Sequence, residues 1–174
     1  EILRCLVGSE MCIRDSCYMT DEEMRELVKL RLESSRELYN DACNLYEQGS
    51  YKSANNRAYY SMEKALKALL AIKGKDANTH NGILQLFNRY FIYEDNTEFN
   101  KADYKLYASI ELIRTASDYD DFYIASKRDT EDVLDQVEYL NEKVYNYIEE
   151  NFINKQIGEN KKVHNLPDFE RENK

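Results

Sequence analysis

The segment at residues 111–121, Glu-Leu-Ile-Arg-Thr-Ala-Ser-Asp-Tyr-Asp-Asp, holds the side chains best suited to binding an anion. Glu111, Arg114 and Asp118 are spaced by three and four residues, so they share one face of a helix. Arginine suits phosphate because its planar guanidinium donates two parallel hydrogen bonds. The pattern indicates an anion-binding arginine held by carboxylates at the mouth of a groove. The spacing by itself favours the simpler alternative, a salt-bridged helix surface worth roughly 0.5 kcal/mol per pair.

A second polar cluster, Asn-Asn-Arg-Ala-Tyr-Tyr, occupies residues 55–60. Asparagine is a weak helix former, and these two lie beside a stripe of small residues. The cluster therefore indicates a buried or interfacial polar role. In the simpler interpretation, Asn56 satisfies polar groups of a neighbouring helix, while Tyr59 and Tyr60 fill space.

Signatures of several other chemistries are absent from the sequence. It has no Walker motif, no Gly-x-Gly-x-x-Gly, no His-Glu-x-x-His and no Gly-x-Ser-x-Gly. His80 is the one histidine of the predicted folded region, and we place it in a loop. A single histidine and cysteines without close spacing argue against a transition-metal site, so we expect no metal and no cofactor.

Composition limits the class of protein. A chain of 174 residues with 43% apolar side chains suits one domain with a packed core. Its net charge of −9 disfavours bulk, sequence-independent DNA binding. The longest apolar run, residues 68–72, is far shorter than the roughly 20 residues of a membrane helix. Cysteines without close spacing favour reduced thiols and a cytoplasmic location.

The two ends of the chain differ from its middle. Residues 1–19 form a leader that we expect to be non-native or disordered, and residues 1–16 resemble a translated sequencing-adapter artefact. Residues 155–174 mix charged and polar side chains with little apolar content, which is typical of a disordered tail. The predicted fold is therefore residues 20–154.

Few helix breakers interrupt that region, which holds one short and four long apolar stripes with helical spacing. We predict an all-α fold, an antiparallel up-down bundle of four long helices plus one short helix. The first two predicted helices run from Asp21 to Gln48, behind a Thr20–Glu23 capping box, and from a Ser50 cap to Lys73. The next two run from Gly82 to Ile92 and from Phe99 to Asp118. The last runs from caps at Ser126 and Thr130 to Phe152. The second helix is apolar on two faces and should be central in the bundle.

Three stretches together resemble the HEPN domain family (higher eukaryotes and prokaryotes nucleotide-binding), and in particular an uncharacterised prokaryotic branch related to toxin–antitoxin systems. They read NNRAYYSMEKALKALLAIKG, THNGILQLFNRYF and IRTASDYDD. The likeness covers residues 32–152. It implies an antiparallel helical bundle, in agreement with the helix pattern.

Many proteins of this family are metal-independent ribonucleases. Their arginine is followed four to six residues later by a histidine, on a helix lining a dimer groove. Arg114 matches the arginine, but the positions where a histidine is expected hold Tyr119, Asp120 and Asp121. A tyrosine with an ordinary pKa of about 10 is a poor general base. The resemblance thus leaves Arg114 and Tyr119 as candidate catalytic residues and the chain's status as an enzyme open. His80 matches the branch's Thr-His-x-Gly motif.

The resemblance implies a homodimer whose groove binds nucleotide or RNA phosphate, in a prokaryotic toxin–antitoxin or defence pair with a nucleotidyltransferase. Arg114 would grip the phosphate and Asp118 would orient Arg114. The remaining predicted contacts come from Asn56, Tyr60, Tyr119 and His80. Two alternatives remain: a protein–protein interaction module that uses surface tyrosines, and an active metal-independent ribonuclease with a departed Arg/His motif.

Overall fold

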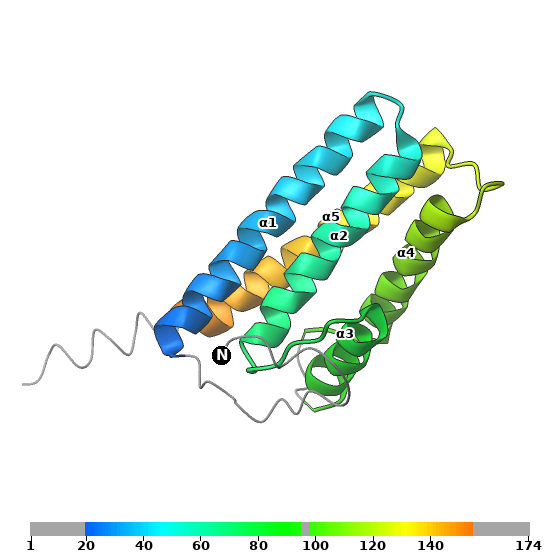
Figure 1. The fold of residues 1–174 in the computed structure, drawn as a ribbon. Helices are drawn as coiled ribbons and strands as arrows, with labels where there is room; N and C mark the ends of the chain where they lie inside the picture. Colours follow the sequence, from blue (N-terminus) through cyan, green and yellow to red (C-terminus); the bar gives the residue numbers. More distant parts are fainter. Residues whose placement is uncertain (1–19, 95–97, 155–174) are drawn as a thin grey trace, which may run out of the picture.

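The computed structural model describes residues 20–94 and 98–154, and within them the chain contains helices and no strand (Figure 1). The elements are α1 (Asp21–Glu47), α2 (Tyr51–Ala71), α3 (His80–Phe87), η1 (Asn88–Tyr93), α4 (Lys101–Tyr119), α5 (Lys127–Ile148) and η2 (Glu149–Ile153). The predicted bundle of four long helices and one short helix is confirmed. The predicted leader and tail lie outside the described residues.

Helix α2 is the centre of the bundle, as its two apolar faces predict. It packs on α1, α3, α4 and α5, and in Figure 1 successive long helices run in opposite directions. Its stripe of small side chains is completely buried and consists of Ala54, Ala58, Ser61, Ala65 and Ala68. Small side chains let the neighbouring backbones approach closely, so α2 can contact several helices at once.

Local signals fix most helix ends. The Thr20 hydroxyl accepts the Glu23 amide at 3.2 Å, and the Glu23 carboxylate accepts the Thr20 amide at 2.7 Å, which completes a capping box. Gly49 and Gly74 take positive φ angles of 76° and 64° after α1 and α2, a conformation that glycine adopts without strain. One predicted cap is wrong in detail, because Ser50 stands at the N-cap of α2 but its side chain makes no capping bond.

The third helix departs from the prediction at both ends. It begins at His80 rather than Gly82, because the Thr79 hydroxyl accepts the Gly82 amide at 3.1 Å and caps the helix two residues earlier. His80 is therefore the first residue of a helix and not a loop residue. At its other end α3 continues as the π-helical segment η1 to Tyr93.

The last two long helices follow the expected capping pattern with shifts of a few residues. Asn100 caps α4, so Phe99 precedes that helix instead of belonging to it. Ser126 caps α5, while Thr130 lies inside the helix with its side chain buried. None of the helices in the described part of the chain combines the length and apolar character needed to cross a membrane.

Candidate functional site

Four of the predicted site residues meet where α2 packs on α4. Asn56 donates through Nδ2 to both carboxylate oxygens of Asp118, at 2.8 and 3.0 Å. Arg114 donates through Nη2 to the Tyr60 hydroxyl at 2.6 Å. The Arg114 Nε atom lies 3.0 Å from Asp118 Oδ2. We call Asn56, Tyr60, Arg114 and Asp118 the arginine network. Two of its members come from each helix, so the antiparallel packing of α2 and α4 assembles it.

The guanidinium of Arg114 is enclosed, because the residue as a whole is only 8% exposed. Its central carbon lies 5.9, 5.3 and 5.6 Å from the ring centroids of Tyr59, Tyr60 and Tyr119, within the range of cation–π attraction. Burial disfavours the charged form, but Tyr60 and Asp118 outweigh burial and raise the pKa of Arg114. A fixed positive charge therefore lies at this packing interface.

The contact between Arg114 and Asp118 is an ion pair without a well-aligned hydrogen bond. Its 3.0 Å separation is short, yet the buried Nε–H has no hydrogen-bond partner among the described residues. We therefore treat the attraction as mainly electrostatic. Asp118 also accepts two bonds from Asn56, and this fixes the carboxylate beside the arginine. The orienting role predicted for Asp118 fits this geometry.

One cleft opens beside the arginine network and a second adjoins it, and most of the residues in their walls are not among the predicted site residues. The smaller cleft has a volume of about 200 Å³. Its walls are Lys52, Ser53, Asn56, Arg57, Ser117 and Asp118. The larger cleft, of about 480 Å³, covers the start of α2 and includes Lys52 and Ser53. Positions 52, 53, 56 and 57 share a face of α2, so helical spacing held a signal for them. No local signal marked Ser117.

His80 belongs to a separate cluster. Its Nδ1 atom lies 2.7 Å from Glu63 Oε2 and 2.6 Å from the Tyr59 hydroxyl. The Tyr59 hydroxyl also lies 2.9 Å from that of Tyr107. Burial raises the pKa of both tyrosines well above its usual value, so both phenols stay protonated. Tyr59 links this cluster to the arginine network, since its ring centroid is 5.5 Å from that of Tyr60.

Tyr119 occupies the last position of α4 and is 73% exposed. Its ring faces the Arg114 guanidinium on one side and solvent on the other. This placement leaves the phenol available to a ligand or to another chain.

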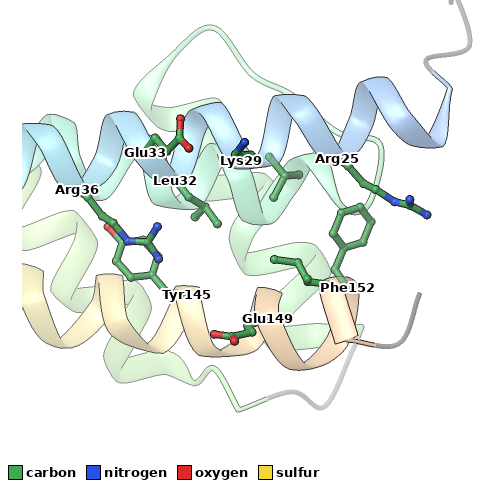
Figure 2. Close-up of a pocket in the computed structure, with 10 residues that line it drawn as sticks. Arg25, Lys29, Leu32, Glu33, Arg36, Tyr145, Glu149 and Phe152 are labelled. Atoms are coloured by element: carbon green, nitrogen blue, oxygen red, sulfur yellow. The ribbon is translucent and has the colours of Figure 1, made fainter. Parts of the chain in front are cut away.

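A third cavity, of about 410 Å³, lies on the opposite side of the bundle between α1 and the end of α5 (Figure 2). Leu32 and Phe152 line it, and the Arg36 guanidinium covers the Tyr145 ring at 4.6 Å. It contains none of the predicted site residues. Among residues 20–94 and 98–154, no group of three or more His, Cys, Asp or Glu side chains is placed to hold a metal ion.

One family model matches most of the chain, and the chain is similar to several curated proteins. Residues 28–150 match the HEPN domain family. The chain is 32% identical over 127 residues to a "UPF0332 protein" of Archaeoglobus fulgidus, which covers 71% of this chain and 97% of that protein. It is 34% identical over 113 residues to "Putative toxin MJ0142" of Methanocaldococcus jannaschii, covering 63% and 73% of the two chains.

The fold is similar to that in the crystal structure of TT1696 from Thermus thermophilus. The TM-score is 0.58 with 22% identity, over 68% of this chain and 96% of that one. At this level of identity the similarity shows the helical fold alone.

Proposed function

This chain belongs to the HEPN domain family, and from that membership we propose that it binds nucleotide or RNA phosphate beside the arginine network. We propose further that it does so as a homodimer, in a prokaryotic toxin–antitoxin or defence pair with a nucleotidyltransferase. The similarity to a protein named as a toxin supports this setting. The observation that carries the binding proposal is the enclosed, charged Arg114 paired with Asp118, a residue that lines a cleft.

The charges around the smaller cleft favour an anion. Lys52 and Arg57 line the cleft, and Arg114 stands directly behind its wall. The one carboxylate in the lining, Asp118, is already paired with Arg114. This part of the surface is therefore locally positive on a chain whose net charge is −9. A local positive potential on an acidic protein attracts phosphate to one place and leaves the remaining surface repulsive.

Replacing Arg114 by alanine tests the proposal. We expect the affinity for a short single-stranded RNA to fall roughly tenfold or more, because the change removes a positive charge from behind the cleft wall and leaves the Asp118 carboxylate in the lining without its ion-pair partner. Fluorescence anisotropy in EDTA at low salt measures the dissociation constant, and circular dichroism checks that the variant folds. Arg89→Ala is the matched control, because that guanidinium is exposed and forms its ion pair with Glu94, away from both clefts.

The outcomes separate the three functions. RNA affinity that is equal in Arg114→Ala and wild type contradicts a role for this arginine. RNA cleavage by the wild type in EDTA, abolished in the variant, extends the proposal to a metal-independent ribonuclease. Absence of both binding and cleavage in the wild type contradicts the proposal and leaves the interaction module.

Exposed apolar side chains at one end of α4 support the dimer. Leu112 and Tyr119 lie two turns apart on one face of α4, while Phe122 and Ile124 follow in the next loop, and all four are largely exposed. Large apolar surface of this kind marks interaction sites. Because the same helix carries Arg114, a second copy docked here would place two arginine networks close together, as in the family's dimer groove.

The double substitution Leu112→Asp/Phe122→Asp is expected to yield a monomer. Each change removes an apolar contribution of about 1.5–3 kcal/mol and introduces a charge that an apolar contact disfavours, so we expect the dimer dissociation constant to rise by roughly a hundredfold or more. Sedimentation velocity over a concentration series measures it. Leu30→Asp, an exposed leucine on α1, should leave the dimer intact. A wild-type monomer, or a dimer that survives the double substitution, contradicts this interface.

A further inference from the structure

The start of α2 combines several features that suit the binding of an anion. Ser50 is the N-cap residue, but its side chain makes no capping bond, and the first turn contains no acidic residue. The first amides of a helix have no intrahelical partner, and they give the helix N-terminus a partial positive charge. Lys52 and Ser53, in this first turn, line both clefts. The positive end of α2 therefore opens directly onto the two cavities.

Ser117 gives an independent indication of a ligand. It reaches the smaller cleft from α4, is 9% exposed, and its hydroxyl oxygen is buried without a hydrogen-bond partner in the described structure. A buried hydroxyl that lacks a partner costs free energy. The hydroxyl oxygen is sealed from the cleft in the observed rotamer, and rotation about the Cα–Cβ bond would turn it toward a phosphate oxygen in the cleft, which would supply the missing acceptor.

The cations of the smaller cleft are better placed than Arg114 to touch a ligand directly. Arg114 is almost fully enclosed and is engaged within its own network. Arg57 is exposed on the cleft wall. Lys52 makes a long 3.4 Å contact to the Asp120 carbonyl oxygen and lies 5.8 Å from the Tyr123 ring centroid, so its ammonium can turn toward an anion at low cost. Arg114 then acts as a positioning residue. It does not touch the ligand, but its charge behind the wall adds to the positive electrostatic potential in the smaller cleft.

The larger cleft has aromatic and apolar walls, unlike the smaller one. This difference determines which end of a nucleotide each cleft would hold. Tyr51, Tyr123 and Ile124 give the larger cleft aromatic and apolar walls that can stack on a base. Asp121 also lines it, and a carboxylate repels phosphate but accepts hydrogen bonds from ribose hydroxyls. The charge difference between the two clefts therefore favours phosphate in the smaller one and nucleoside in the larger one.

We infer that the N-terminus of α2, together with Lys52, Arg57 and Ser117, forms the direct phosphate site for a nucleotide whose base lies against Tyr123. This inference rests on the proposed function and deepens it, since it names the groups that touch the phosphate. The ligand class is a nucleoside 5′-phosphate, either free or as the end of an RNA strand.

The charge-removing pair Lys52→Gln/Arg57→Gln tests the site with three probes: adenosine 5′-monophosphate, adenosine and hexa-adenylate RNA. Calorimetry on the wild type should show tighter binding of the monophosphate than of adenosine. In the pair, monophosphate affinity should fall roughly tenfold or more, while adenosine affinity changes little. The control pair Arg89→Gln/Lys105→Gln removes two positive charges from residues outside both clefts and should leave all affinities unchanged.

Ser117→Ala gives a readout that a purely structural role would not produce. Removing an unpartnered buried hydroxyl should leave the melting temperature unchanged or raise it. The same change should weaken monophosphate binding by roughly threefold, as for one lost hydrogen bond. A melting temperature that is unchanged or raised, together with weaker monophosphate binding, supports the site. A fall in stability without a fall in affinity contradicts it.

The comparison of variants separates this inference from the function on which it rests. Monophosphate and RNA affinities that are unchanged in Lys52→Gln/Arg57→Gln, with RNA affinity lost in Arg114→Ala, overturn the α2 site and leave the proposed function standing. Wild-type protein that binds neither adenosine 5′-monophosphate nor RNA overturns both. Hexa-adenylate that binds when the monophosphate does not identifies the RNA strand as the ligand form.

Discussion

Substituting alanine for Asp103 should lower the free energy of unfolding by about 3 kcal/mol, as for one partner removed from a buried ion pair. Asp103 is 1% exposed. Its carboxylate accepts a bond from Lys143 Nζ at 2.9 Å, from the Asn100 amide at 2.8 Å and from the Tyr139 hydroxyl at 3.3 Å. One side chain therefore caps α4 and joins it to α5, and its loss leaves the Lys143 ammonium without that carboxylate.

A double-mutant cycle with Lys143→Met measures the coupling. Urea unfolding followed by circular dichroism should give a double variant less destabilised than the sum of the two single variants, because neither charge is then left unpaired. Asp132→Ala, an exposed aspartate on α5, is the control and should change stability by less than about 0.5 kcal/mol. Additive single effects, or a cost for Asp103→Ala below about 1 kcal/mol, contradict this account.

The pH dependence of the same pair has a definite sign. Burial disfavours the Lys143 ammonium, but the hydrogen bonds to Asp103 and Tyr139 outweigh burial and raise its pKa above the ordinary 10.5. A group whose pKa is raised on folding contributes its full stabilisation below the unfolded value, and the contribution disappears as the pH rises through the folded value. The contribution of Lys143 should therefore be constant at neutral pH and decline in the alkaline range above about 10.5.

The helix ends that sequence predicts well are those set by neighbouring residues. Thr20 and Glu23 form their capping box within one turn, and Gly49 and Gly74 end their helices through their own backbone freedom. The π-helical segment η1 depends on packing instead. Its buried member Phe91 is completely enclosed by other parts of the chain, and no local pattern indicates the wider turn.

The candidate site also has contacts that the local sequence predicts and contacts that depend on how the helices pack. Arg114 and Asp118 are four residues apart on one helix, so their pairing follows from helical spacing. The bonds from Asn56 and Tyr60 cross to another helix, and only the family resemblance placed these residues beside the arginine. Ser117 reaches the cleft because of the way α2 and α4 pack, which spacing within one helix does not specify.

His80 shows that a match to a sequence motif does not by itself give the position of a residue in the fold. The resemblance grouped it with the arginine network, but Glu63 and Tyr59 hold it in a neighbouring cluster at the start of α3. Glu63 lies four residues after Tyr59 on α2, a spacing that could have indicated this cluster. The two groups of polar residues meet at the Tyr59 ring. The position of α3 therefore decides where His80 lies relative to Arg114.

Aromatic packing sets the position of α3, and Phe91→Ala should reveal how strongly. The Phe91 ring centroid lies 6.3 Å from that of Phe87, 5.9 Å from Phe99 and 5.7 Å from Tyr147. These four rings join α3 and η1 to α5 and to the segment before α4. Truncating a fully buried phenylalanine to alanine costs about 3–5 kcal/mol, and we expect a loss of unfolding free energy in this range.

The loss of stability in Phe91→Ala should be larger in α3 and η1 than in α1 and α2. Phe91 packs directly against α3, whereas it supports the contact of α1 with α2 less directly. Native-state amide hydrogen exchange should accelerate in α3 and η1 at conditions where α1 and α2 remain protected. Phe91→Leu keeps much of the ring volume and is the control, with an expected cost of less than about 1.5 kcal/mol. Exchange that accelerates equally in all helices would mean that α3 has no independent stability, and that His80 is released only by global unfolding.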